Sequence, residues 1–412
     1  MAKGNIVTGI DIGTYSIKAL AAQHNGKEWE VLAYEEIPSF GLRKGSVVSV
    51  EETSKNIQMI ISGLERDCNK RIHSAFVNIG GSHLYVTPSD GIISVSRADQ
   101  RISNEDVERV LQATKAINIP HNEEVLDVFP KEFIIDDQKG IRQPEGLTGI
   151  RLEAKVLLLC YFQPYFTNLT QAVLNAKLQI KDVLPSPLAA ANAVLTPQQK
   201  ELGVALIDMG AATTSLVVFE EGELIHLAVL PIGSANITND IAIGLKTDVA
   251  VAESIKKQHG TCIFAKTDKD RSNQAKKKIE IFSAKGGSAS GGDNTLNFTK
   301  KNLVDIIEPR VSEILDLIQK ELKKIGRQEL LPGGVILTGG GAKISRIKEL
   351  TRETLKLACE IGEPKGILGL QDDPAMAAVV GLVLEGVDFG GEDGNIGRWM
   401  DKIKRWLRNL VP

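Results

Sequence analysis

Cysteine is scarce and widely spaced in this chain of 412 residues. Its four cysteines, Cys68, Cys160, Cys262 and Cys359, form no Cys-x-x-Cys pair. This spacing argues against a disulfide scaffold and against a zinc site built from cysteines, and it favours reduced thiols in the cytoplasm. The six histidines are equally scattered, and the chain has no Gly-x-Ser-x-Gly elbow and no Walker-type glycine loop. A hydrolase triad and a P-loop fold are therefore not expected.

Long apolar runs and a strong charge imbalance are also missing. The longest apolar runs, Val156 to Phe162 and Ala375 to Leu384, fall far short of the ~20 residues that span a bilayer, so we expect any membrane contact to be peripheral. The net charge is -3, from 49 Lys and Arg against 52 Asp and Glu, and it argues against a general nucleic-acid surface. Apolar residues make up 42% and charged residues 25%. These values are ordinary for folded proteins, and the length predicts more than one domain.

A pattern near the start of the chain returns in its second half. Asp11-Ile-Gly13 and Asp208-Met-Gly210 each follow a β-branched run, and each is followed by small or hydroxylated residues and a second β-rich run. Each copy then reaches a second turn at a similar distance. Two such hairpins, 197 residues apart, predict two similar domains that face each other across a cleft.

Turns of this kind suit a phosphate ligand. Their backbone N–H groups and hydroxyls can face phosphate oxygens, while Asp11 and Asp208 would hold a hydrated Mg²⁺. A third glycine motif, Gly339-Gly340-Gly341, ends a buried-type strand and permits close approach of a ligand. Either aspartate motif alone is better read as a plain turn, but the three motifs together favour a nucleotide cleft.

Five stretches occur in an order that is typical of one superfamily. They are Asp11-Ile-Gly-Thr14, Pro187-Leu-Ala-Ala-Ala-Asn-Ala-Val-Leu195, Asp208-Met-Gly210, Leu337-Thr-Gly-Gly-Gly341 and Asp373-Pro-Ala-Met-Ala-Ala-Val-Val-Gly381. The order resembles the actin, sugar kinase and heat-shock chaperone ATPase superfamily. There, such stretches form the first phosphate loop, the first connecting helix, the second phosphate loop, the adenosine motif and the second connecting helix. The resemblance covers roughly residues 1–384 and implies an α/β, actin-like two-lobed ATPase fold with ATP and Mg²⁺ in the cleft.

Within that superfamily the chain is most similar to the FtsA family of bacterial cell-division actin homologues. An inserted module follows Val77-Asn-Ile-Gly-Gly81, where this family has its α+β subdomain 1C. Ile306-Ile-Glu-Pro-Arg-Val-Ser-Glu-Ile314 resembles a stretch common in the family, and the chain ends in a linker and a basic amphipathic helix. The resemblance divides the chain into 1–83, 163–200 and 365–385 as the core of the first lobe (1A), 84–162 as 1C, 201–231 and 303–364 as the core of the second lobe (2A), 232–302 as a small subdomain (2B), 386–395 as a linker and 396–412 as a membrane-targeting helix.

The resemblance also assigns residues to the nucleotide. The expected contacts are Gly13, Thr14, Tyr15, Ser16, Lys18, Gly210, Ala211, Thr213, Thr214, Glu253, Lys256, Gly339, Gly340, Gly341 and Lys343, with Asp11 and Asp208 near Mg²⁺ through water. Glu253 and Lys256 match positions that hold the ribose or adenine in the superfamily; a solvated helix face is the alternative reading of this pair. Relatives that hydrolyse ATP usually place an acid or amide just before the first connecting helix, where this chain has Ser186. Serine is a poor base, so we expect ATP binding with at most weak hydrolysis, and Asp182 is the alternative base.

The last 17 residues predict an amphipathic helix. At about 100° per residue, its apolar side chains fall on one face and its basic side chains on the other. The apolar face holds Ile396, Trp399, Met400, Ile403, Trp406, Leu407, Leu410 and Val411, and the opposite face includes Lys402 and Arg405 among five Lys and Arg and one Asp. Such a helix fits an anionic membrane surface. The alternative is a helix that docks on the core of its own protein.

The resemblance implies a peripheral protein that polymerises into filaments on the cytoplasmic face of the cell membrane at the division site. It would bind anionic lipids of the inner membrane through the final helix, the C-terminal tail of the tubulin-like protein FtsZ through 2B, and other division proteins through 1C. Lys300, Lys301 and Arg310 are either contacts for an acidic FtsZ tail or solvated charges at a helix start. The alternatives are a PilM-like adaptor of pilus assembly, which normally lacks the final helix, and a soluble kinase or chaperone ATPase of the same fold.

Replacing Trp406 by glutamate puts a charge in the centre of the apolar face. We expect this change to release the protein from anionic vesicles and to leave ATP binding unchanged. Wild-type recruitment should rise with anionic lipid and fall with salt, because each basic residue near the surface contributes roughly 1 kcal/mol. Vesicle flotation of both proteins is the measurement, and equal flotation would mean that the helix is not the anchor.

Overall fold

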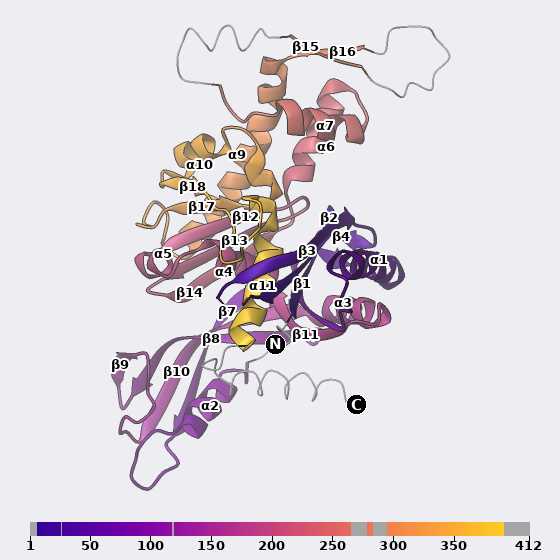
Figure 1. Cartoon of the computed structure of the whole chain (residues 1–412). Helices are drawn as coiled ribbons and strands as arrows, with labels where there is room; N and C mark the ends of the chain where they lie inside the picture. Colours follow the sequence, from indigo (N-terminus) through magenta and orange to yellow (C-terminus); the bar gives the residue numbers. More distant parts are fainter. Residues whose placement is uncertain (1–5, 26, 118, 265–277, 283–294, 391–412) are drawn as a thin grey trace.

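The computed structural model describes residues 6–25, 27–117, 119–264, 278–282 and 295–390. Figure 1 shows two lobes with an inserted unit that extends away from them. The first lobe contains β1 (Ile6–Ile12), β2 (Ser16–His24), β3 (Trp29–Pro38), β4 (Leu42–Arg43), β5 (Ser46–Val47), α1 (Val50–Cys68), β6 (Ser74–Ile79), α3 (Gln163–Asn175), β11 (Gln179–Pro185), α4 (Ser186–Val194), η2 (Pro374–Met376) and α11 (Ala377–Gly390).

The remaining elements form the inserted unit and the second lobe. The inserted unit contains β7 (Tyr85–Ser94), α2 (Asn104–Ala113), β8 (Glu123–Ile135), β9 (Gln138–Ile141) and β10 (Arg151–Phe162). The core of the second lobe contains α5 (Pro197–Leu202), β12 (Val204–Met209), β13 (Thr214–Glu220), β14 (Glu223–Leu230), α9 (Lys300–Lys324), β17 (Val335–Thr338), η1 (Gly340–Lys343), α10 (Ile347–Leu355) and β18 (Cys359–Ile361). Its small subdomain contains α6 (Ser234–Leu245), α7 (Val249–His259), β15 (Lys278–Phe282) and β16 (Thr295–Thr299).

The same strand order occurs in both lobes. The sheet of the first lobe runs β11-β6-β1-β2-β3, and the strands of the second lobe run β18-β17-β12-β13-β14. In each lobe an antiparallel meander of three strands comes first. A later strand then pairs in parallel with the first strand of the meander, and one more strand pairs in parallel with that one. The repeat of the two aspartate motifs is therefore a repeat of the fold. The α/β two-lobed fold predicted from the sequence is confirmed.

Long amphipathic helices provide much of the apolar surface that covers these sheets. In α9 the Thr299 hydroxyl accepts a hydrogen bond from the backbone N–H of Asn302 and so caps the first turn. The buried side chains of α9 recur every three or four residues and are Leu303, Val304, Ile307, Val311, Ile314, Leu315, Ile318 and Leu322. Such a stripe buries one face of a helix against a core. In the first lobe α1 has the same role, with Ser49 as its cap and Ile57, Ile60 and Leu64 in the core.

The inserted unit adds its strands to the sheet of the second lobe. Its strand β10 lies between β7 and β8, and β7 meets β14 at the pair Ala228 and Tyr85. An ion pair between Arg142 and Glu221, with Nη2 and Oε2 2.8 Å apart, also joins the inserted unit to the second lobe. The inserted unit is therefore an insertion in the sequence of the first lobe, but its strands belong to the sheet of the second lobe.

The two connecting helices, α4 and α11, pack against each other with almost no space between their backbones. A side-chain carbon at Gly381 in α11 would overlap the carbonyl oxygen of Ala189 in α4. At Gly9 in β1, a side-chain carbon would lie 2.9 Å from the carbonyl oxygen of Val379 in α11. Figure 1 shows α11, in yellow, running beside β1 of the first lobe. Glycine is thus needed on both sides of α11 for this close approach.

The linker predicted for residues 386–395 is wrong in its first half, because α11 continues to Gly390. The Cα of Gly386 faces Val7 and Phe76 so closely that a side-chain carbon there would overlap both side chains. Packing on β1 and β6 therefore overrides the low helix propensity of glycine. No helix among the described residues is both long enough and apolar enough to cross a bilayer. The predicted amphipathic helix at 396–412 lies outside those residues.

Replacing Gly381 by alanine should destabilise the whole protein. The new methyl group meets the α4 backbone, which cannot rotate away, and overpacking of this kind costs about 1–3 kcal/mol. Gly63→Ala in α1 is the matched control, because its new methyl group meets only the flexible carboxylate end of Glu35. There the gain in helix propensity, about 1 kcal/mol, should keep the melting temperature at or above that of the wild type. Thermal unfolding of both variants tests this, and equal melting temperatures would contradict it.

Candidate functional site

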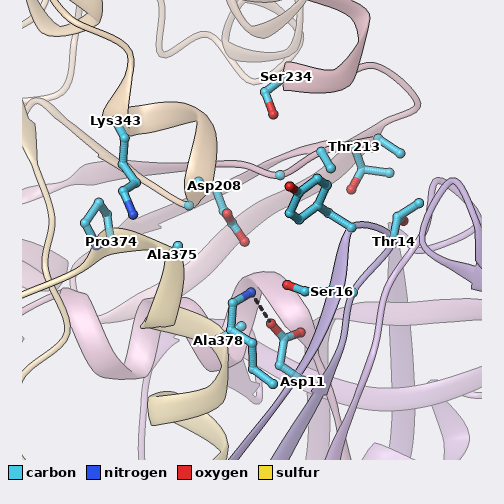
Figure 2. A pocket seen from close by; sticks show the side chains of 18 of the residues that line it. Asp11, Thr14, Ser16, Asp208, Thr213, Ser234, Lys343, Pro374, Ala375 and Ala378 are labelled. Carbon is cyan, nitrogen blue, oxygen red and sulfur yellow. Dashed lines mark ion pairs between the residues drawn. The ribbon is translucent and has the colours of Figure 1, made fainter. Parts of the chain in front are cut away.

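The two aspartate turns and the glycine motif meet at a single cavity of about 690 Å³ between the lobes. A volume of this size is typical of a small-molecule site. All of the residues that were predicted to contact nucleotide or Mg²⁺ line this cavity, except Thr214 and Gly341. Figure 2 shows Asp11 and Ser16 from the first lobe and Asp208 and Thr213 from the second lobe around the same space.

The turn after each aspartate has the same backbone geometry. The N–H of Gly13 donates to the carbonyl of Ser16 at 3.2 Å, and the N–H of Gly210 donates to the carbonyl of Thr213 at 2.9 Å. Each turn therefore holds two residues at its tip, where the backbone can face the cavity. Such turns provide N–H groups that bind phosphate oxygens.

Asp11 sits in a network that restrains its carboxylate. Asn78 donates from Nδ2 to Asp11 Oδ1 at 2.7 Å, and Lys18 Nζ lies 3.6 Å from Asp11 Oδ2. The Asn78 side chain is itself fixed, because its Oδ1 accepts a hydrogen bond from the N–H of Ile12 at 2.6 Å. Burial raises the pKa of the Asp11 carboxyl, and Lys18 and Asn78 partly offset that rise.

Asp208 occupies the equivalent place in the second lobe but has fewer partners. Among the described residues, no side chain makes a hydrogen bond or an ion pair with its carboxylate. Burial, followed by the negative charge of Asp11, raises the pKa of Asp208 to about 6, while Lys18 lowers it in part. Gly339, with a φ of 82°, lies against this carboxylate, and a side-chain carbon there would overlap Asp208 Oδ1. Glycine at this position lets the third motif approach the aspartate.

These two carboxylates fit a hydrated divalent cation. The described residues hold no group of three or more His, Cys, Asp or Glu side chains that could bind a metal ion, so the protein would supply only Asp11 and Asp208. Mg²⁺ bound with phosphates usually keeps several waters and needs one or two carboxylates. Gly340 also suits a ligand, because its Cα faces open space in the cavity wall.

Ser186 lines the cavity and is held in place by its neighbours. Its Oγ accepts a hydrogen bond from Asn78 Nδ2 at 2.9 Å and donates one to the carbonyl of Ile79 at 3.1 Å. The hydroxyl hydrogen is thus already used by a backbone carbonyl, and within the described part of the chain no carboxylate or imidazole accepts it. The alternative base, Asp182, is not among the lining residues and accepts a hydrogen bond from the N–H of Val183.

Glu253 and Lys256 also line the cavity, but much of their bonding capacity is used within the small subdomain. Lys256 Nζ lies 2.7 Å from Glu253 Oε2, and it donates to Thr238 Oγ1 at 2.8 Å and to the carbonyl of Ser234 at 3.1 Å. The side chain of Lys256 is buried. This network ties α7 to α6, so Lys256 has a structural role at this edge of the cavity.

Two residues that were predicted to contact the nucleotide do not line the cavity. Thr214 is fully buried, and its Oγ1 donates to the carbonyl of Ile232 at 2.8 Å, because it begins β13 on the core side of the pleat. Gly341 is buried against Met209. The predicted membrane-facing residues, from Ile396 onward, lie outside the described residues.

The cavity also includes residues that sequence reasoning missed. Asn78 is the most important, since it bridges Asp11 and Ser186. The signal was a lone amide in the strand Ser74–Ile79, in which only Ser74 is also polar. Asp373 forms an ion pair with Lys343 at 2.7 Å. Gly45 and Gly81 touch each other at the rim, where the N–H of Gly45 donates to Thr14 Oγ1 at 2.9 Å. These loops come together only through the fold.

Comparison with known proteins identifies two family models along the chain. The model described as Cell division protein FtsA matches residues 205–381, and the model described as SHS2 domain inserted in FTSA matches residues 81–160. The chain is 36% identical to Cell division protein FtsA of Pseudomonas aeruginosa, over 98% of both chains. It is 34% identical to the Bacillus subtilis protein of that name, over 93% of this chain and 84% of that protein. For the Escherichia coli K12 protein the identity is 30%, over 98% and 97%.

Solved structures show the same fold at lower identity. The PilM-PilN type IV pilus biogenesis complex matches with a TM-score of 0.64 and 19% identity, over 92% of this chain and 98% of that chain. MreB5 of Spiroplasma citri bound to ADP matches with a TM-score of 0.56 and 12% identity, over 93% and 97%. At these identities the likeness shows an actin-like fold and nothing finer.

Replacing Asp208 by asparagine should stabilise the protein without ligand and weaken its binding of Mg-ATP. An acid whose pKa is raised in the folded state destabilises that state when it ionises; the cost is absent below about pH 4 and complete above about pH 6. At pH 7.5 the free energy of unfolding of Asp208→Asn should therefore exceed that of the wild type by on the order of 2–3 kcal/mol. The variant should then melt at a higher temperature, and the difference should shrink at pH 5. The shift in melting temperature that Mg-ATP produces should fall, with an affinity loss of tenfold or more, about 1.4 kcal/mol.

Asp11→Asn is the matched control for this experiment. It leaves Lys18 without its ion pair, so it should stabilise the unliganded protein less than Asp208→Asn does. A variant Asp208→Asn that melts at or below the wild type at pH 7.5 would show that this carboxylate is not strained in the cleft. Differential scanning fluorimetry at both pH values provides the comparison.

Proposed function

Because the chain belongs to the FtsA family of cell-division proteins, we propose that it binds ATP with Mg²⁺ between its lobes, polymerises on the cytoplasmic face of the membrane and anchors FtsZ there. The observation that carries this proposal is similarity to FtsA proteins along almost the whole chain, which includes both lobes and the inserted unit. The likeness to the PilM structure is one of fold, and the basic amphipathic C-terminal sequence argues against a PilM-like adaptor.

For the nucleotide, the chain supplies position and charge. The turns at Gly13 and Gly210 would hold phosphate oxygens with backbone N–H groups, and Asp11 and Asp208 would hold the hydrated cation. Mg²⁺, when bound, neutralises phosphate charge. Ser186 is a poor base, because a neutral hydroxyl oxygen hardly takes up a proton, so it cannot activate water as a carboxylate would. Its hydroxyl is also already bonded to Asn78 and to the carbonyl of Ile79. ATP would therefore act mainly as a ligand that joins the lobes, and its hydrolysis would be weak.

For FtsZ, the small subdomain at 232–302 is the proposed docking region. The guanidinium of Arg310 is already held by Asp240, with Nε and Oδ2 2.6 Å apart and Nη2 and Oδ1 3.0 Å apart, and by Glu313. Lys301 is exposed at the start of α9, so it is the better candidate for contact with an acidic tail. Other division proteins would bind the inserted unit.

Co-sedimentation with anionic vesicles tests this function. We expect a labelled FtsZ C-terminal tail peptide to pellet with vesicles only when this protein is present, and more of it to pellet with Mg-ATP. Lys301→Glu should reduce peptide capture several-fold, since like charges repel, without releasing the protein from vesicles. Lys320→Glu, at an exposed site further along α9, is the charge-matched control. Equal capture of a scrambled peptide would contradict FtsZ anchoring.

A further inference from the structure

A side-chain pair crosses the mouth of the cleft. Tyr15 lies in the β1–β2 turn of the first lobe, and Lys257 lies on α7 in the small subdomain of the second. Lys257 Nζ donates a hydrogen bond to Tyr15 Oη at 3.0 Å and lies 4.9 Å from the centroid of its ring, within cation–π range. Both residues line the cavity, yet Tyr15 is 55% exposed and the Lys257 side chain is 59% exposed. They therefore sit at the opening of the cavity and not at its base.

The backbone on each side of this pair is fixed. The Tyr15 carbonyl accepts a hydrogen bond from the N–H of Ser39 at 3.1 Å, and the turn that carries Tyr15 is closed by the Gly13–Ser16 hydrogen bond. On the other side, the network of Lys256, Glu253 and Thr238 holds α7 against α6. The contact can therefore follow a movement of the opposite lobe only as far as the two side chains reach. A larger separation of the lobes at this point breaks the contact between Tyr15 and Lys257.

The tyrosine is not required by the turn itself. The matching turn of the second lobe, Gly210 to Thr213, has Ala212 at the position of Tyr15 and closes with the same hydrogen bond. Ala212 also lines the cavity, so a small residue is compatible with the geometry of the turn. A turn of this geometry thus forms with alanine in the other lobe, so the turn itself does not require the large side chain of Tyr15.

We propose that Tyr15 and Lys257 form a strap across the mouth of the nucleotide cleft, which must open each time a nucleotide enters or leaves. This inference rests on the proposed function, because it takes the ligand of the cleft to be ATP. The strap adds a barrier to exchange in both directions. Since it lies at the mouth, it changes the rates of entry and exit more than it changes affinity.

The test is stopped-flow exchange of a fluorescent ATP derivative in the presence of Mg²⁺. Tyr15→Ala and Lys257→Met should each raise the association and dissociation rate constants by about tenfold, the value of one such hydrogen bond and cation–π contact. The dissociation constant should change by less than about threefold, because the proposal places the Tyr15 side chain at the opening and not, as the resemblance implied, on the nucleotide. The double variant should match either single variant, because each alone removes the strap. Tyr15→Phe keeps the ring and should be intermediate, and Lys320→Met, which removes an exposed charge from α9, should behave as wild type.

Three results would overturn the strap. One is a dissociation constant that rises in proportion to the dissociation rate constant, which would make the two residues direct ligands of the nucleotide. Another is an additive double variant, and the third is unchanged rate constants in both single variants. A wild-type protein that does not bind the ATP derivative at all would overturn the proposed function and the strap with it, whereas binding with unchanged rates overturns the strap alone.

Discussion

Backbone contact between α4 and α11 sets the geometry on which the site depends. Both helices begin at the cavity: α4 starts at Ser186, and α11 follows the turn at Asp373 and Pro374. Small residues, Ala189 in one helix and Gly381 in the other, let them meet without side chains between them. Helices with large residues at this crossing would stand farther apart. Because both helices start at the cavity, its shape would then change.

The two aspartate turns share the same backbone hydrogen bond, but the charged side chains around the two aspartates differ. Asp11 is paired across β1 and β2 with Lys18, whereas Asp208 is paired across β12 and β13 with Ser215. Lys18 consequently stabilises the ionised carboxylate of Asp11. The carboxylate of Asp208 has no such cation on its neighbouring strand, and the negative charge of Asp11 raises its pKa. A cation bound between the lobes, as proposed above, would relieve this imbalance, so the cost of ionising Asp208 in the empty cleft would favour cation binding. The repeat provides two similar turns, and the difference at one position makes them unequal.

The fold and most of the cavity were predictable because short local patterns specify them. A β-branched run before Asp-x-Gly favours a hairpin from local sequence alone, and the recurrence of this pattern indicated the second lobe. The missed features depend on contacts between distant segments. Asn78 matters only because β6 lies beside β1, and α11 continues past Gly386 only because Val7 and Phe76 pack against it. Thr214 was misplaced because a hydroxyl next to a phosphate turn suggests a ligand, while the pleat of β13 turns it toward the core.

The inserted unit belongs to one lobe through the chain and to the other through its sheet. Two covalent crossings, near Leu84 and Phe162, attach it to the first lobe, while the pair of Ala228 and Tyr85 and the ion pair of Arg142 and Glu221 attach it to the second. The inserted unit therefore links the two lobes. The ion pair is exposed and so contributes little to stability in water. A rotation of one lobe relative to the other would therefore strain these contacts, because the insert is attached to both lobes.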